Sequence, residues 1–217
     1  MKTIPIIIYL IFIQCFNLFS QSDSIQYTKG FKFNEGFYLS FEDFKNNKPS
    51  IPSSKLVTRQ ISSGEDHTNL FFVGKTLSYY DSKGKETKIR SKKTWGYCHK
   101  NKVYVQKHGT FSPLYNIGSI IFFSEDIGHI LYNTYEPGLP KTDFDGLGPN
   151  RTFLIDFNTG IRYESTIENF LQLISVDKEL YDEFIALKDR NEMRYKFFAY
   201  MNKFNERNPI YIKINKD

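Results

Sequence analysis

The stretch KTWGYCHKNKVYVQKH, residues 93–108, indicates most directly how this chain folds. Aromatic and β-branched residues form two short runs, at 95–99 and 103–107, on either side of a polar turn. Two such runs joined by a short polar segment predict a β-hairpin. In the register with its turn at residues 100–102, Cys98 pairs with Val103, and Cys98 and His99 point to opposite faces because side chains alternate along a strand. The stretch therefore predicts antiparallel sheet and argues against a Cys–His catalytic pair.

The aromatic residues of this hairpin have two interpretations. Regular alternation places Trp95, Tyr97 and His99 on one face, where Trp95, Tyr97 and Tyr104 form a cross-strand cluster. In that interpretation Cys98 is a small core residue; in the other, Trp95 and Tyr97 belong to a binding surface. The scattered histidines give no paired spacing with one another or with Cys98, as a structural zinc site requires. We predict no metal and no cofactor. The four histidines are His67, His99, His108 and His129.

Further segments of strand composition surround the hairpin between residues 36 and 164. Asp81-Ser82-Lys83-Gly84 predicts a tight turn, because Gly84 tolerates the positive φ that such turns need. Asn158-Thr159-Gly160 predicts a second one. Residues 42–55 contain Pro49 and Pro52 and read as a connector, and 136–151 reads as a long loop. The other predicted strands are 36–41, 56–61, 70–73, 77–81, 86–90, 117–124, 129–135, 152–157 and 161–164.

The pattern changes to a helical period after residue 164. Residues 165–168, Ser-Thr-Ile-Glu, fit a capping box, and Asp177 begins a second helix with Val176 and Tyr181 as a hydrophobic staple. The apolar stripe loses phase at 189–191, which predicts a kink or a break in the helix. Pro209 ends the helical region, because the residue before a proline is disfavoured in helical geometry.

These segments together predict an α+β fold: an antiparallel β-sheet or open barrel with two or three C-terminal helices packed on it. We expect a flexible N-terminal segment at 21–35 and a single domain over 36–217. In that domain residues 36–164 are mainly β, 165–208 are helical and 209–215 form a terminal strand.

Residues 1–20, MKTIPIIIYLIFIQCFNLFS, have the pattern of a signal peptide. Lys2 precedes an uncharged apolar run, and the small residues Ser20 and Ser22 follow. The run is shorter than the roughly 20 apolar residues of a membrane-spanning helix. We therefore predict an exported protein, periplasmic or extracellular, with no transmembrane segment after signal removal. Cys15 would leave with the signal, and Cys98 would then be alone.

Two segments resemble parts of exported bacterial proteins of unknown function. The first is GFYLSFEDFKNNKP, residues 36–49, which carries the pattern GxYxSFxxFxxxxP; the second is FLIDFNTG, residues 153–160. The resemblance covers about a tenth of the chain and implies export, while it implies no catalytic residue.

The run KGKETKIRSKK, residues 83–93, holds six cations and one acid, in a chain with a formal net charge of +5. Alternation places Lys88, Arg90 and Lys92 on one strand face, which could receive phosphate, an anionic glycan or a lipid headgroup. A protein is the other expected class of partner. The alternative is a lysine-protected edge strand. The modest charge and the predicted compartment disfavour nucleic acid.

No nucleophile motif, phosphate loop or metalloprotease signature is present. The expected function is therefore non-catalytic binding or a structural role in the bacterial envelope or outside the cell. One alternative is a hydrolase assembled from distant residues, with His129 as base and Asp126 as its orienting acid. Another is an inhibitor or immunity-type partner of a second protein.

Overall fold

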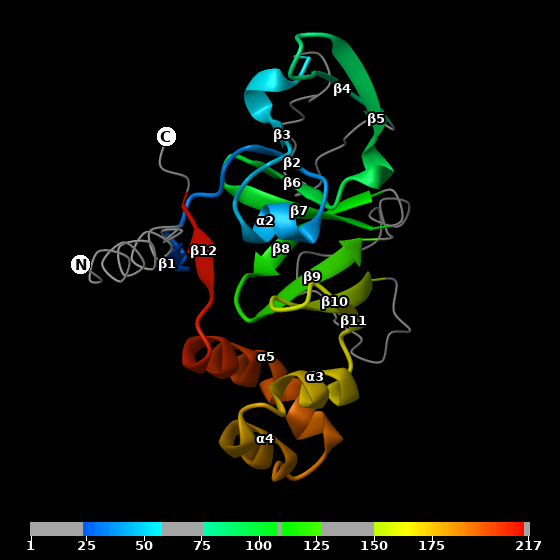
Figure 1. Cartoon of the computed structure of the whole chain (residues 1–217). Coiled ribbons are helices and arrows are strands. Elements are labelled where there is room, and N and C mark those ends of the chain that lie inside the picture. Colours follow the sequence, from blue (N-terminus) through cyan, green and yellow to red (C-terminus); the bar gives the residue numbers. More distant parts are fainter. Residues whose placement is uncertain (1–23, 58–75, 108–109, 127–149, 215–217) are drawn as a thin grey trace, which may run out of the picture.

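The computed structural model of the chain describes residues 24–57, 76–107, 110–126 and 150–214 (Figure 1). An eight-stranded antiparallel sheet has the order β11-β10-β9-β8-β7-β6-β2-β3, and helices follow it in the chain. This confirms the α+β prediction, with an open sheet and not a closed barrel. The strands are β2 Gly36–Tyr38, β3 Ile51–Pro52, β6 Gly96–His99, β7 Lys102–Lys107, β8 Thr110–Asn116, β9 Ile120–Asp126, β10 Asn150–Asp156 and β11 Arg162–Glu164.

The predicted central hairpin is β6–β7. Its two turn residues, Lys100 and Asn101, both have positive φ, of 47° and 60°. A two-residue loop with that geometry matches the twist of the flanking strands. Cys98 pairs with Val103, as predicted. The Asn101 side chain also accepts a hydrogen bond from Phe33 N at 3.0 Å and donates one to Phe31 O at 3.2 Å. The hairpin turn thereby fixes the N-terminal segment against the sheet.

One face of the sheet is covered by this N-terminal segment, by helix α2 (Phe41–Lys45) and by strand β12 (Tyr211–Lys213). Strand β1 (Ser24–Gln26) pairs with β12, and Phe31 and Phe33 are buried. Residues 24–35 therefore belong to the packed structure, whereas we had predicted a flexible segment there. The prediction missed that these rings supply core for the face that the C-terminal helices leave uncovered.

Helix α2 begins at Phe41, the last residue of the predicted strand 36–41, and continues into residues 42–55, where we predicted only a connector. Ser40 Oγ accepts from Asp43 N at 3.1 Å, and the Asp43 carboxylate accepts from Ser40 N at 2.9 Å, which is a complete capping box. The fully buried Phe44 ring stacks on Trp95 with 4.5 Å between centroids. The two prolines follow the helix and do not interrupt it, so the connector prediction is wrong here.

The opposite face carries two separate covers. A ribbon of β4 (Thr76–Tyr80) and β5 (Glu86–Arg90) packs Leu77 over Phe37 and Tyr97 at one end. At the other end α3 (Ile167–Ile174), α4 (Lys178–Ile185) and α5 (Arg190–Arg207) pack on β9 and β10. Figure 1 shows the ribbon and the helices at opposite ends of the molecule. The buried apolar residues of the helices are Ile167, Phe170, Ile174, Leu180, Phe184, Phe197, Met201 and Phe204.

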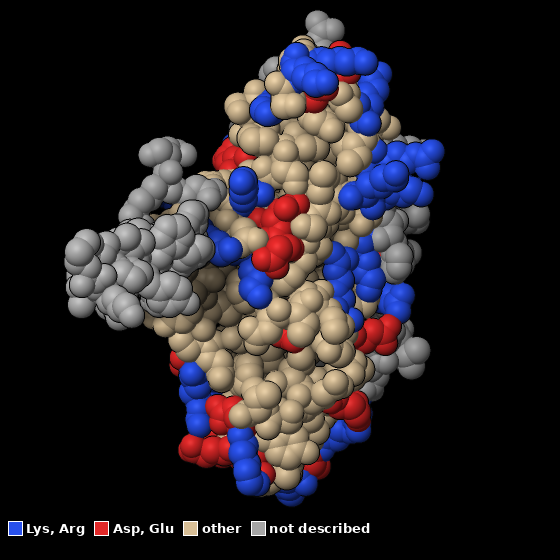
Figure 2. All heavy atoms as spheres, viewed as in Figure 1, with Lys and Arg blue, Asp and Glu red and all other residues tan. Residues whose placement is uncertain are grey.

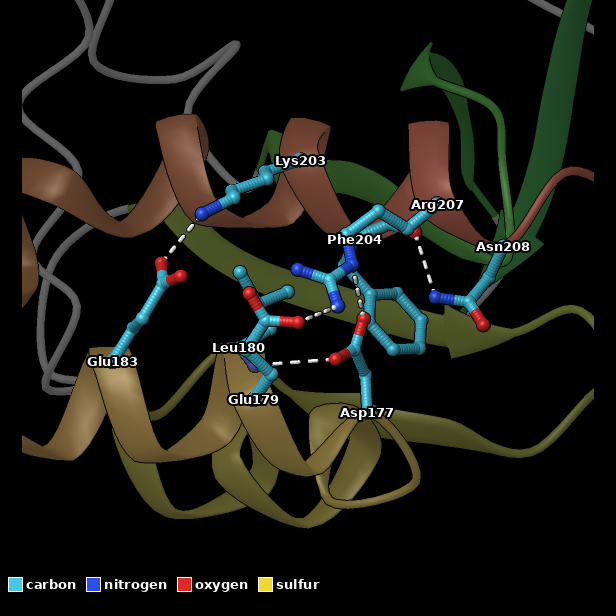
Figure 3. A network of polar contacts seen from close by, with 8 residues as sticks. All are labelled: Asp177, Glu179, Leu180, Glu183, Lys203, Phe204, Arg207 and Asn208. Carbon is cyan, nitrogen blue, oxygen red and sulfur yellow. Dashed lines mark hydrogen bonds and ion pairs between the residues drawn. The ribbon is translucent and has the colours of Figure 1, made fainter.

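The helix boundaries follow the predicted caps with two corrections. Asp177 Oδ1 accepts from Leu180 N, and its other oxygen pairs with Arg207 Nε at 2.8 Å, so one carboxylate caps α4 and ties it to α5 (Figure 3). Asp189 begins α5 at the predicted break. Thr166, not Ser165, caps α3, because Ser165 is buried and one residue too early. Val176 is 80% exposed, so the predicted staple is not made.

Some predicted elements lie outside the described residues, and others differ from the strands observed. The signal peptide, the strands at 70–73 and 129–135 and most of the loop at 136–151 lie outside the described residues. Strand β8 was not predicted, and the strand predicted at 117–124 begins three residues later, as β9. Within the described ranges, no helix is both long enough and apolar enough to cross a membrane.

The sheet curls strongly toward the face that carries α2. Arg162 of β11 donates a hydrogen bond from Nη1 to the Gln106 carbonyl of β7 at 2.6 Å. These strands stand four places apart in the sheet order, which in a flat sheet is about 19 Å at about 4.8 Å per strand. That separation exceeds the reach of an arginine side chain. The β7–β11 part of the sheet therefore forms a half-barrel whose concave side contains Phe123 and Phe153.

Candidate functional site

Charged side chains from four strands gather on the concave side of the half-barrel. Lys107 ends β7, Glu125 lies near the end of β9, Arg151 lies near the start of β10, and β11 begins with Arg162 and ends with Glu164. Arg151 pairs with Glu125 in the backbone register, and Phe153 pairs with Glu164. Because every second residue shares a face, these side chains lie on the same face as the Phe153 ring. We call this group of six the cationic mouth: Lys107, Glu125, Arg151, Phe153, Arg162 and Glu164.

The cationic mouth is organised around the Phe153 ring. Lys107 Nζ lies 2.9 Å from the ring centroid, and Arg151 Cζ lies 5.7 Å from it. A cation above a phenylalanine face is attracted by the ring quadrupole. Arg151 also pairs with Glu164 at 2.5 Å; these two side chains are 40% and 51% exposed, so the outer edge of the mouth is open to solvent.

Among the described residues of the mouth, the cations outnumber the carboxylates. Burial lowers the pKa of Lys107, and Arg151 and Arg162 lower it further, whereas Glu125 and Glu164 act in the opposite direction. Burial also lowers the pKa of Arg162. Desolvation disfavours the charged form of a group, and a neighbouring opposite charge restores it. Three cations stand against two carboxylates, one of which, Glu125, is only 4% exposed. An anion entering the mouth would relieve this imbalance.

The predicted anion face is only partly a strand face. Lys88 and Arg90 are exposed on β5, on the side opposite Ile89, as alternation requires. Lys92 belongs to the short 3-10 helix η3, Ser91–Lys93, and not to the strand. The predicted ladder of three therefore ends at Arg90, because β5 stops there. All three side chains are exposed.

Trp95 and Tyr97 do not share a face, so that prediction is wrong. Trp95 packs on α2, whereas Tyr97 stacks on Tyr104 with 4.7 Å between centroids in the cluster beneath the β4–β5 ribbon. Trp95 precedes β6, and the alternation starts only at Gly96, where a Cβ would collide with the Tyr104 carbonyl. Trp95 and Tyr97 are 7% and 2% exposed. Both serve as core, and neither presents a ring to a ligand.

The Cys98 thiol is buried and unreactive in character. Burial, with the charge of Glu35, raises its pKa to about 12, and a neutral thiol is a poor nucleophile. Asp126 pairs with Asn150 at the end of β9; its side chain and all of His129 lie outside the described part of the chain. In residues 24–57, 76–107, 110–125 and 151–214, no group of three or more His, Cys, Asp and Glu side chains is placed to hold a metal ion.

Comparison with known proteins identified no relative of the chain. No protein-family model matches the chain, and no curated protein or solved structure shows significant similarity to it.

Sequence reasoning did not select Lys107, Arg151 or Arg162. A local signal exists: in Arg151-Thr152-Phe153 a cation occupies the same strand face as a buried aromatic ring, at the end of a strand. The meeting of these cations depends on strand order and curl, which no local pattern specifies.

Proposed function

We propose that this chain is an exported, non-catalytic binding protein whose cationic mouth holds an anionic group of its ligand. The observation that carries the proposal is the convergence of Lys107, Arg151 and Arg162 from three strands: Lys107 and Arg151 lie at the Phe153 ring, and Arg162 bonds the Gln106 carbonyl beside Lys107. Export rests on the pattern of residues 1–20, which remains a sequence prediction.

The three cations suit a carboxylate, sulfate or phosphate group. A guanidinium presents donors in a fixed fork that matches such groups, and an ammonium adds a compact charge. Arg162 is held by its bond to the Gln106 carbonyl, and Lys107 is held over Phe153. Partly buried, pre-positioned donors lose little conformational freedom on binding, which favours affinity.

Binding of sodium sulfate tests the proposal. The mature chain, residues 21–217, is titrated by calorimetry with sulfate against chloride at matched ionic strength. Lys107→Gln should weaken sulfate binding about tenfold, equivalent to about 1.4 kcal/mol. The control is Lys213→Gln, an exposed lysine on β12, which removes the same charge away from the mouth.

Equal sulfate affinity in the Lys107→Gln and Lys213→Gln variants would show that the mouth is not the binding site. Equal response of the wild type to sulfate and chloride would remove the proposal altogether, because simple screening would then account for both ions.

A further inference from the structure

Further exposed Lys and Arg side chains lie on the β4–β5 ribbon and on η3, which follows it. Apart from Glu86, the charged residues between 83 and 93 are all Lys or Arg, and all of these are exposed. None of them enters an ion pair with another described residue. We call Lys88, Arg90, Lys92 and Lys93 the basic ribbon. Figure 2 shows Lys and Arg side chains along the side of the molecule that carries β5 and, beyond it, beside β10.

The base of the basic ribbon adjoins the mouth. Trp95 O accepts a hydrogen bond from Gln106 N at 2.7 Å, so the chain leaving η3 runs beside the end of β7. Lys93 precedes Trp95 by two residues, and Lys107 directly follows Gln106. The backbone that leaves η3 therefore lies beside the end of β7, where the mouth begins. We call the cations of the basic ribbon and of the mouth together the band: Lys88, Arg90, Lys92, Lys93, Lys107, Arg151 and Arg162.

We propose that the ligand is a linear anionic polysaccharide that lies along this band, with one charged group in the cationic mouth and the following groups on the basic ribbon. This inference rests on the function proposed above and adds the ligand class. From Lys88 to Arg90 alone the band covers about 7 Å of strand at about 3.3 Å per residue, before η3 and the mouth are added. A single small anion cannot contact both ends of such a band, whereas a polymer with repeating charges can.

The shape of the band favours a polymer over a bilayer. Lys107 and Arg162 are partly buried on a concave surface, and the side chains of the basic ribbon are exposed. A flat array of headgroups would meet the ribbon and leave the mouth unfilled, while a flexible chain can enter it.

The same surface disfavours nucleic acid. Single-stranded nucleic acids stack their bases on exposed aromatic faces. In the band the Phe153 ring is covered by Lys107, and Trp95 and Tyr97 of the adjoining hairpin are buried. Tyr80 of β4 is exposed on the same face of the ribbon as Lys88 and Arg90, but one ring does not make the row of rings on which successive bases stack.

The test compares heparin fragments of two lengths, a disaccharide and a dodecasaccharide, as defined sulfated probes. Three variants of the mature chain are used: Lys107→Gln in the mouth; Lys88→Gln with Arg90→Gln and Lys92→Gln in the ribbon; and a control triple. The control replaces Lys48, Lys188 and Lys213 with Gln, which are exposed and lie outside the band. The control triple thus removes the same charge as the ribbon triple.

We expect the dodecasaccharide to bind the wild type at least about tenfold more tightly than the disaccharide. The ribbon triple should bind the dodecasaccharide no more tightly than the disaccharide and should keep the wild-type affinity for the disaccharide. The slope of log affinity against log salt concentration should become shallower by about two to three, about one for each lost contact. Lys107→Gln should weaken both fragments, and the control triple should match the wild type.

Two groups of results would overturn the inference. The proposal of a polymeric ligand fails if the wild type binds the dodecasaccharide no more tightly than the disaccharide. It also fails if the ribbon triple and the control triple bind the dodecasaccharide equally well. If the chain binds phosphatidylglycerol vesicles more tightly than heparin, and the ribbon triple loses that binding, the ligand is a membrane. The same result with a single-stranded oligonucleotide of equal charge would make the ligand a nucleic acid. Failure of the mouth itself is distinct, because disaccharide binding would then be insensitive to Lys107→Gln.

Discussion

Replacing Arg162 with Met tests the curl that creates the mouth. Met keeps an apolar stem in place of the arginine stem and removes the guanidinium that bonds the Gln106 carbonyl at 2.6 Å. A hydrogen bond from a charged donor contributes about 1.5 to 3 kcal/mol to stability. We therefore expect Arg162→Met to lower the free energy of unfolding by about 2 kcal/mol.

Arg151→Met is the matched control on the neighbouring strand. Its guanidinium pairs with Glu164, and both side chains are substantially exposed, at 40% and 51%. An exposed ion pair contributes about 0.2 to 1 kcal/mol. Both arginines lower the pKa of Lys107, so both variants relieve the same kind of repulsion. The difference between them isolates the bond across the half-barrel.

Urea denaturation in chloride buffer measures both variants, followed by circular dichroism and by the fluorescence of Trp95, the single tryptophan. For a chain of this size, about 2 kcal/mol corresponds to a fall in melting temperature of about 4 to 8 °C. If Arg162→Met and Arg151→Met cost the same within about 0.5 kcal/mol, the cross-strand bond does not hold the curl and the geometry of the mouth is wrong.

Three further predictions concern the scaffold. Phe184→Ala should cost about 3 to 5 kcal/mol in urea denaturation, because the ring is fully buried between α3 and α5, and a loss near zero would mean that the helices do not pack as described. Asp189→Ala should lower the free energy of unfolding by about 1 kcal/mol, since the Asp189 carboxylate accepts hydrogen bonds from two backbone amides at the start of α5. Asp189→Asn should keep most of that stability, because an amide oxygen can still cap the helix. Equal losses in the two variants would show that Asp189 does not act as a cap. Burial raises the pKa of Cys98 from about 9 to about 12, so iodoacetamide at pH 8 should modify the thiol only after unfolding. Between about pH 9 and pH 12 the folded thiol keeps a proton that the unfolded thiol loses, so the free energy of unfolding should fall as the pH rises through that range. Rapid alkylation of the native protein at pH 8 would contradict the burial of Cys98.

The turns and helix caps could be predicted because their chemistry is local. Gly84 and Gly160 adopt the positive φ that their predicted turns require, at 74° and 73°. Asp177 and Asp189 begin helices where the sequence pattern indicated a start and a break.

Strand β8 and helix α2 show where local patterns mislead. Pro113 lies inside β8, although proline disfavours a central strand. The strand tolerates it beside a register shift between Leu114 and Asn116. For α2, the two prolines favoured a connector, whereas the helix that precedes them begins at a capping box formed by Ser40 and Asp43.

The face of Trp95 and the cationic mouth are tertiary features. Trp95 lies just before β6 and packs on the α2 side, so the alternation of the strand does not extend to it. Lys107 and Arg162 are far apart in sequence and on strands four places apart in the sheet; only the curl joins them. The density of cations at 83–93 favours that run as an anion site, whereas the mouth is built from cations scattered over three strands.

The most direct test of the account is a crystal structure of the mature chain soaked in selenate and measured at the selenium absorption edge. We predict an anomalous peak in the cationic mouth, within hydrogen-bond distance of Lys107 Nζ and of a guanidinium nitrogen of Arg151 or Arg162. A mouth without a peak, with Lys107 turned to an ion pair with Glu125, would contradict the claim that these cations form an anion site.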